Sequence, residues 1–207
     1  MIANVNFSKQ NLISLIVGII LGAVGVTAIR FAFVKDDHVH YHANFALYVN
    51  GKRDEFKDSS FYEEVAACDI HDADNVKAHV HMHDNNNALV HVHASGITWS
   101  DFFNNLGYTL SDKLVKTDRG VYIDGENSNH LAFMLNGQKV TSLANKVIKS
   151  EDVLLINYGQ DDNKTLTNRY DAIPRDAHMA NTTTDPASCS GSEPLTFTTR
   201  LRKSFGF

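Results

Sequence analysis

Histidine supplies the most distinctive chemistry in this sequence. The chain has 207 residues and 11 histidines, and eight of them fall in three short runs with histidine at every second position. The neutral imidazole ring is the commonest metal ligand in proteins and binds zinc, copper, iron and nickel. Residues two apart on a β-strand point to the same face, so each run would present a row of imidazoles. The runs are His38, His40 and His42; His79, His81 and His83; and His91 and His93.

The second and third runs flank residues 84–87 (Asp-Asn-Asn-Asn), a cluster that favours a turn. In an antiparallel hairpin, paired residues share a face and their residue numbers have a constant sum. A sum of 172 pairs His81 with His91, a sum of 174 pairs His83 with His91, and either puts all five imidazoles on one face. The sum of 172 corresponds to a three-residue loop, which needs a residue in the left-handed region, and Asn tolerates that conformation.

The pattern predicts a transition-metal site on this face, with copper or zinc as the expected ion. Paired residues on neighbouring strands have Cβ atoms about 4.5–5.5 Å apart, so two imidazoles can share one ion at Zn–N distances of about 2.0–2.1 Å. We expect the ligands to come from His40, His42, His79, His81, His83, His91 and His93. Further candidates, as ligands or as groups that orient a ligand, are His38, His71 and Asp84.

Two other interpretations of the histidine runs remain open. The runs would also fit a solvated polar strand face, or an imidazole cluster that senses pH near neutrality. Asp84 is a good turn residue, which favours a turn role over a metal-binding one. His130 and His178 are isolated in the sequence and are expected on the surface, whereas Met82 should point away from the histidines because of its parity.

One stretch of the chain resembles exported bacterial proteins. It begins with an H-x-H (His40 and His42) and an N-G hairpin (Asn50-Gly51). The segments H-V-H-M-H-D (79–84), L-V-H-V-H-A (89–94) and W-S-D-F-F-N-N-L-G (99–107) are similar to the HxHD…HxHA…FFxxxG motif of an uncharacterised family of exported, His-rich bacterial proteins. The resemblance covers residues 38–107 and carries no established activity. It implies a role for His40, His42, His81, His83, Asp84, His91 and Phe102-Phe103.

The elements that would position the histidines are short strands and one short helix. Residues 39–49 alternate in polarity and predict a half-buried strand, and Asn50-Gly51 and Asn136-Gly137 predict hairpin turns. Residues 98–101 (Thr-Trp-Ser-Asp) form a capping box that starts a helix, and Gly107 would end it. We therefore expect an α+β fold, with an N-terminal transmembrane helix followed by a small antiparallel or mixed sheet with one or two short helices.

The N-terminal region contains a membrane-spanning candidate. Residues 12–29 carry no charge, and a run of this length can cross a bilayer core of about 30 Å. We expect a cytoplasmic N-terminus and anchor at residues 1–35, with the following domain on the extracytoplasmic side of the cell membrane. A cleaved signal peptide is the alternative. Residues 36–159 would form the His-rich domain, and residues 160–207, rich in Asp, Asn, Thr and Ser, a polar extended tail.

Charge and cysteine content limit the partners and the compartment. Lys9 and Arg30 are two of the 19 basic residues, which leaves 17 basic against 24 acidic residues after Arg30. This acidic balance argues against a nucleic-acid partner, which would need a basic face. Export permits a disulfide between the two cysteines, Cys68 and Cys189. The expected partners are the lipid bilayer and a metal ion.

Three functions are compatible with these features. The first is a membrane-anchored extracytoplasmic protein that binds copper or zinc for capture, buffering or delivery, and the surplus of imidazoles favours it. The second is a metal-dependent enzyme with a His-ligated ion and an open position for water; the lack of a glutamate beside the histidine runs argues against it. The third is a structural surface module in which a metal only fastens strands together.

Overall fold

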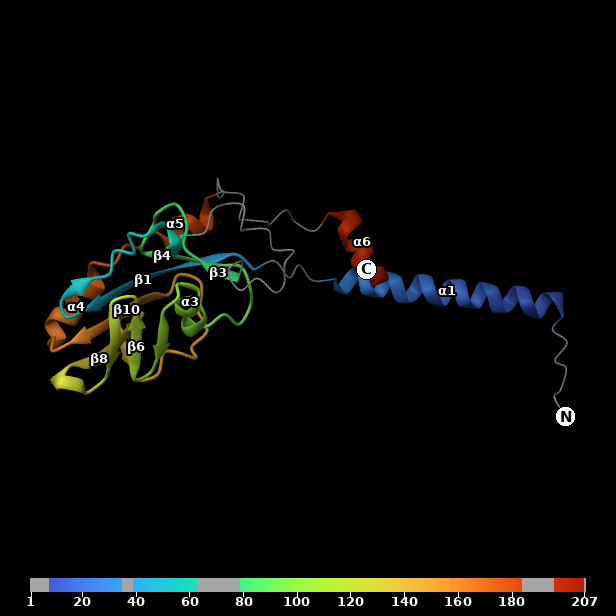
Figure 1. Ribbon diagram of the computed structural model, residues 1–207. Helices are drawn as coiled ribbons and strands as arrows, with labels where there is room; N and C mark the ends of the chain where they lie inside the picture. The colour runs from blue at the N-terminus through green and yellow to red at the C-terminus, as the bar shows by residue number, and fades with distance from the viewer. Residues whose placement is uncertain (1–7, 35–38, 63–78, 184–195, 207) are drawn as a thin grey trace, which may run out of the picture. The chain divides into compact units, whose positions relative to one another are not determined.

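The computed structural model describes four stretches of the chain, residues 8–34, 39–62, 79–183 and 196–206. The chain divides into two compact units, one made of residues 1–37 and 192–207 and the other of residues 38–191. Both units are drawn in Figure 1, and each is described here by itself. The histidine runs belong to the second unit. The fold is α+β, as the sequence predicted.

The first unit contains two helices, α1 (Lys9–Phe33) and α6 (Phe197–Phe205). The Ser8 hydroxyl caps α1 by accepting a hydrogen bond from the Asn11 N–H at 3.2 Å. Among the helices that the structure describes, α1 alone is long and apolar enough to cross a membrane, and none of the residues in its most apolar window is buried. A signal sequence has the same properties, so the helix supports either of the predicted roles.

A mixed sheet organises the second unit (Figure 1). Its strands run in the order β3-β4-β1-β10-β8-β9, and β2 pairs with the end of β1. The β1–β10 pair is parallel and every other pair in this sheet is antiparallel. The strands are β1 (Tyr41–Val49), β2 (Lys52–Arg53), β3 (Val80–His81), β4 (Leu89–Val92), β8 (His130–Leu135), β9 (Gln138–Val140) and β10 (Val153–Gly159).

Two predicted hairpin turns connect neighbouring strands of this sheet. Asn50 and Gly51, at φ 49° and 82°, join β1 to β2, and Asn136 and Gly137, at φ 51° and 79°, join β8 to β9. Two consecutive residues with positive φ make a type I′ turn, whose twist matches that of the flanking strands. The prediction from the Asn-Gly dipeptides is therefore confirmed.

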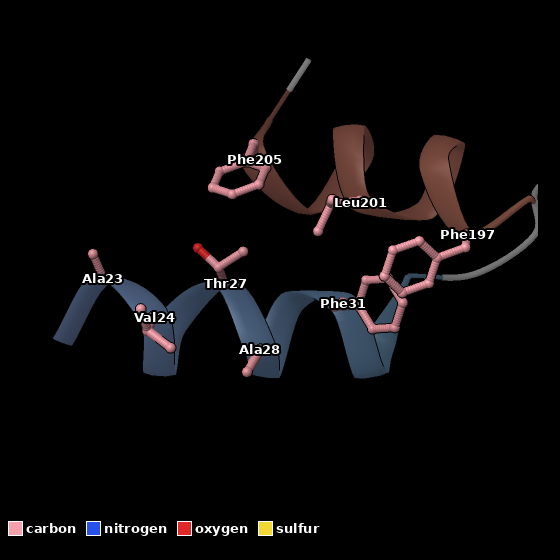
Figure 2. A pocket seen from close by; sticks show the side chains of 8 residues that line it. All are labelled: Ala23, Val24, Thr27, Ala28, Phe31, Phe197, Leu201 and Phe205. Atoms are coloured by element: carbon pink, nitrogen blue, oxygen red, sulfur yellow. The ribbon is translucent and has the colours of Figure 1, made fainter. Parts of the chain in front are cut away.

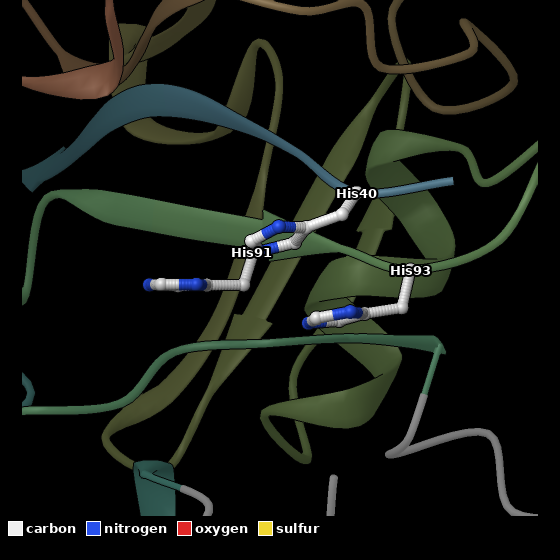
Figure 3. A group of neighbouring side chains, drawn as sticks. All are labelled: His40, His91 and His93. Carbon is white, nitrogen blue, oxygen red and sulfur yellow. The ribbon is translucent and has the colours of Figure 1, made fainter. Parts of the chain in front are cut away.

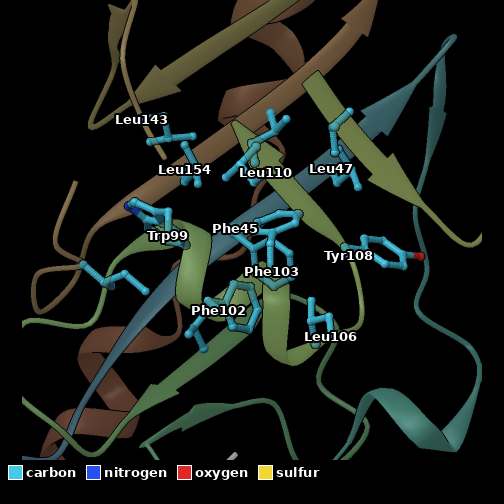
Figure 4. Packing of buried hydrophobic residues seen from close by; sticks show 14 of the residues in the cluster. Phe45, Leu47, Trp99, Phe102, Phe103, Leu106, Tyr108, Leu110, Leu143 and Leu154 are labelled. Carbon is cyan, nitrogen blue, oxygen red and sulfur yellow. The ribbon is translucent and has the colours of Figure 1, made fainter. Parts of the chain in front are cut away.

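One face of the sheet carries the main apolar core (Figure 4). Phe45 and Leu47 of β1 lie on this face with Trp99, Phe102 and Phe103, and all five side chains are buried. The three aromatic residues belong to α3 (Trp99–Asn105), whose Thr98–Asp101 capping box forms as predicted. A small antiparallel sheet covers the same side; its strands are β5 (Thr109–Ser111), β6 (Leu114–Thr117) and β7 (Gly120–Ile123).

The opposite face of the sheet is covered by two helices that the sequence did not predict. They are α4 (Asn163–Asp171) and α5 (Ala177–Thr182), and both lie in the same compact unit as the sheet. Leu166 of α4 is buried with Ile173 in a second apolar cluster on this face. The interpretation of residues 160–207 as an extended polar tail is therefore corrected. Leu166 is the one buried residue of α4. It is enough to dock the helix, but a single apolar residue produces no periodic pattern in the sequence.

Short 3-10 helices complete the described elements. They are η1 (Ser59–Phe61) and η3 (Glu126–Ser128).

The docking of α4 predicts that its one buried leucine stabilises the domain. Leu166→Ala should lower the free energy of unfolding by about 2–5 kcal/mol, because it removes buried apolar surface and leaves a cavity. The control Lys164→Ala, at an exposed position of the same helix, should change it by less than about 0.5 kcal/mol. Urea denaturation of the full chain in detergent, followed by Trp99 fluorescence, measures both. Equal effects would mean that α4 does not pack on the sheet.

Candidate metal centre

Three neighbouring strands, β3, β4 and β1, bring the histidine runs side by side. Val80 pairs with Val92 and His81 with His91, so the register has the sum of 172, one of the two sums that the sequence allowed. His91 pairs in turn with His42 of β1. One step along the strands, the His93 N–H donates to the His79 carbonyl at 2.8 Å. The imidazoles therefore form an inner row and an outer row across the sheet. The inner row is His81, His91 and His42, and the outer row is His79, His93 and His40.

The imidazole rings of the two rows are in mutual contact. The ring centroids of His83 and His91 lie 3.6 Å apart, and those of His42 and His91 lie 4.3 Å apart. The His93 ring stacks on His40 at 4.7 Å and on His81 at 4.9 Å. Rings this close repel one another when protonated, so the cluster requires neutral imidazoles or a shared cation.

Three of these histidines form a group that could hold a metal ion (Figure 3). One ring nitrogen from each of His40, His91 and His93 lies within 4.8 Å of the other two. An ion bound at about 2.0–2.1 Å to each nitrogen would bring the three nitrogens somewhat closer together. His91 belongs to β4, His93 follows the end of β4, and His40 precedes the start of the paired strand β1.

The histidine face is buried, whereas the alternating sequence predicted a half-buried strand with a polar face. His42, His81, His83 and His91 are only 2–4% exposed. The difference arises because α5 packs against β1 and covers the inner row. Buried polar groups must find partners in the protein or in a ligand.

Burial and mutual repulsion keep two of the imidazoles neutral. The pKa of His93 is lowered from 6.5 to about 2, first by desolvation and then by the neighbouring histidines, of which His81 has the largest effect. Desolvation and the neighbouring His42 lower the pKa of His91 even further. A neutral imidazole keeps a lone pair available for a metal. The Nε2 atom of His93 is buried without a hydrogen-bond partner among the described residues.

Asn181 of α5 fixes the tautomer of His42. Its Oδ1 atom accepts from the backbone N–H of His42 at 2.8 Å and lies 2.8 Å from His42 Nδ1. Because the backbone N–H can only donate, the atom facing it is the amide oxygen, and Nδ1 of His42 must carry the proton. His42 Nε2 then accepts from His91 Nδ1 at 2.9 Å. This chain of hydrogen bonds leaves Nε2 of His91 with the free lone pair.

Asp84 orients a second imidazole. Its Oδ2 atom lies 2.6 Å from Nδ1 of His83, so His83 also carries its proton on Nδ1 and directs Nε2 into the cluster. Asp84 has φ 56° and Asn85 has φ 53°, which makes the turn after His83. Asp84 therefore combines the predicted turn role with the predicted orienting role. A carboxylate behind a ligand histidine is a common arrangement in metal sites.

A pocket of about 280 Å³ lies between the inner row and α5. Met179 and Ala180 of α5 line it opposite His42, His83 and His91. The sequence did not indicate these α5 residues because no spacing rule links residues 176–183 to the histidine runs.

Asp176, the residue that precedes α5, ties the helix to the sheet. Its carboxylate accepts hydrogen bonds from Asn44 and from Asn86, the latter at 2.9 Å. The Ala177 N–H donates to Asn44 Oδ1 at 3.0 Å. Asn44 is buried in β1, directly after the first histidine run. The polar residues beside the histidines therefore hold the cover of the site in place.

The remaining predicted residues lie outside the cluster or outside the described stretches. His79 is half-buried at the end of the outer row. His130 and His178 are exposed and lie near Asp124 and Glu151. Met82 is buried in the apolar core on the opposite face, as its parity predicted. The residues outside the described stretches are His38, His71, Cys68 and Cys189, so the predicted disulfide stays a prediction.

The second unit is thus an α+β domain with a buried histidine cluster that could hold a metal ion. Comparison with known proteins finds no matching family model, no matching curated protein and no matching solved structure. The resemblance of residues 38–107 to exported His-rich bacterial proteins remains a prediction.

The lowered histidine pKa values predict acid sensitivity of the metal-free chain. Below pH 6.5, His91 and His93 bind protons in the unfolded chain but stay neutral in the folded chain. Acid therefore stabilises the unfolded state, and the free energy of unfolding falls as the pH falls. For His93, the free energy of unfolding continues to fall until the pH approaches 2. The slope is at most about 1.4 kcal/mol per pH unit for each histidine. Urea denaturation with a chelator at pH 7, 6 and 5 measures this slope.

A variant identifies the histidine contribution to that slope. His93→Gln should make the slope shallower by up to about 1.4 kcal/mol per pH unit, whereas Thr167→Ala, at an exposed position without a titrating group, should keep the original slope. An unchanged slope in His93→Gln would show that His93 binds protons equally in the folded and unfolded chain.

Proposed function

We propose that the chain binds a transition-metal ion through its buried imidazoles and serves to capture, buffer or deliver that ion at the extracytoplasmic side of the membrane. One observation carries the proposal: ring nitrogens of His40, His91 and His93 converge within 4.8 Å. Further imidazoles surround this group within ring-contact distance. Without an ion, so many adjacent buried imidazoles only reduce stability in acid, whereas with an ion they act as ligands and reserve ligands.

Binding fits the site better than tuned catalysis does. The two carboxylates beside the cluster already position other groups: Asp84 holds His83, and Asp176 holds Asn44 and Asn86. A general base needs a free proton acceptor within reach of the reacting water. Both oxygens of Asp176 are already engaged, and Asp84 uses Oδ2 to hold His83. The surplus of imidazoles over the three or four ligands that an ion takes suits uptake and transfer.

The thioether of Met179 favours copper among the candidate ions. Met179 lines the same pocket as His42, His83 and His91. Thioethers are soft ligands that select Cu(I), whereas imidazole alone also suits zinc. Met179 is 66% exposed, so its thioether could turn towards an ion held by His91, the one proposed ligand that also lines this pocket.

We also propose that α1 anchors the chain with the second unit outside the cytoplasm. The helix is 25 residues long, which at 1.5 Å per residue exceeds a bilayer core of about 30 Å. Capture of scarce metal is a task of the outer side, which agrees with this orientation.

A metal-dependent enzyme is the second candidate, and the 280 Å³ pocket beside the imidazoles is the observation that favours it. Such an enzyme keeps an open coordination position for water. Azide added to the cobalt(II)-loaded chain would then change its visible absorption, whereas an ion fully ligated by protein would not respond.

Metal content is the direct test of the proposed function. The full chain, purified in detergent without a histidine tag, should retain at least one equivalent of copper or zinc after dialysis, measured by elemental analysis. His91→Ala should lower the affinity at least tenfold, because His91 is one of the three converging ligands and lies at the centre of the cluster. His178→Ala, at an exposed position, should bind as the unmodified chain does. A chain that binds no metal, or equal behaviour of both variants, would refute the assigned site.

The role of Met179 has its own measurement. Met179→Leu should weaken binding of Ag(I), a redox-inert substitute for Cu(I), by about tenfold and leave Zn(II) binding within about twofold, because only the soft ion uses the thioether. The control Met134→Leu changes a methionine in the second apolar cluster and should affect neither ion. Equal loss of both ions in Met179→Leu would assign Met179 a packing role.

A further inference from the structure

Helix α6 has an apolar side and a basic side. Phe197, Leu201 and Phe205 follow one another at a spacing of four residues and lie on one face of the helix. The same nine residues include Arg200, Arg202 and Lys203. Thr196 caps the helix at its N-terminus through the Thr199 N–H, and Gly206 ends it at φ 90°. The helix therefore forms as a complete amphipathic unit with both ends capped.

An apolar groove lies between α6 and the second half of α1 (Figure 2). Its volume is about 450 Å³, and the rings of Phe31 and Phe197 meet at one end with centroids 5.4 Å apart. The Thr27 side chain supplies the one polar group of the lining. The lining residues are Ala23, Val24, Thr27, Ala28, Phe31, Phe197, Leu201 and Phe205.

Basic side chains lie at both ends of α6. The Arg200 guanidinium lies 5.5 Å from the centre of the Phe31 ring, and its Nη2 donates to the Val34 carbonyl at 3.2 Å. The Nε atom of Arg200 is buried without a hydrogen-bond partner among the described residues. Arg30 of α1 approaches Gly206 at the end of α6. The described residues of this unit include no acidic side chain.

We propose that the groove binds one anionic phospholipid, with an acyl chain between α1 and α6 and the phosphate at Arg200, while Arg202 of the same helix adds positive charge. Arg30 ends the uncharged run of α1 and would lie at the level of the headgroups. The groove extends from Phe31 back to Ala23, eight residues or about 12 Å of helix, towards the hydrocarbon. Basic residues close to a membrane surface attract anionic lipid, and an anionic oxygen would satisfy Arg200 Nε.

An acyl chain suits this groove better than a peptide does. The lining offers one hydroxyl and no backbone edge for the hydrogen bonds that an inserted peptide would need in hydrocarbon. The long arginine and lysine side chains can keep their charges at the headgroups while their stems cover the apolar groove. The lipid would therefore fasten α6 to the anchor.

Native mass spectrometry of the full chain in detergent tests the proposal. Phosphatidylglycerol and phosphatidylcholine with the same acyl chains are added in equal amounts, and the retained lipid is counted. The unmodified chain should keep one phosphatidylglycerol in roughly tenfold preference to phosphatidylcholine. The double variant Arg200→Gln, Arg202→Gln should reduce that preference to about twofold or less. The charge-matched control Lys52→Gln, Lys57→Gln, at exposed positions of the second unit, should keep it.

Other outcomes would overturn the lipid site. Equal retention of the two lipids by the unmodified chain would remove the headgroup assignment, and unchanged preference in the arginine variant would move the site elsewhere. Glycerol phosphate, added as a probe without acyl chains, should not be retained; its retention would show that the groove plays no part. Circular dichroism of each variant verifies that the helices are intact, and none of these results depends on metal binding.

Discussion

Neutral imidazoles buried side by side are the constraint on which the rest of the second unit depends. His83 and His91 are held with their ring centres 3.6 Å apart, a spacing that two protonated rings would not tolerate. The fold meets this constraint with Asn181 and Asp84, which each hold one imidazole nitrogen in its protonated form and aim the other at the cluster. Helix α5 is therefore part of the site as well as its cover, because Asn181 belongs to it.

The apolar core on the other face of the sheet is what keeps the histidines in register. Val80 and Met82 of the second run and Val90 and Val92 of the third are buried in that core. Since side chains alternate along a strand, a slip by one residue would turn every histidine into the core and every valine out of it. The hydrophobic effect at these valines thus fixes the positions of the imidazoles with a force that is independent of any bound ion.

Sequence reasoning succeeded where a local pattern has one physical meaning and failed where contacts are distant. The alternation of His79–His83 and His91–His93 predicted the shared face and left two possible registers, of which the structure has one, and the Asn-Gly dipeptides predicted two turns. Helix α5 has six residues and no apolar period, and its contact with β1 joins residues 139 positions apart. No spacing rule links residues so far apart. The sequence therefore predicted neither the burial of the histidine face nor the positions of Asn181 and Met179 beside it.

The arrangement of hydrogen bonds also distinguishes the histidines from one another. His42 gives its Nδ1 proton to Asn181 and its Nε2 lone pair to His91, which commits both nitrogens while the cluster is in this state. His93 has an Nε2 atom that no described group satisfies. An ion at the proposed site would take one ring nitrogen from each of His40, His91 and His93. Under the proposed function, His42 could join these ligands only if its bond to His91 opened, which would separate a first binding position from a reserve one.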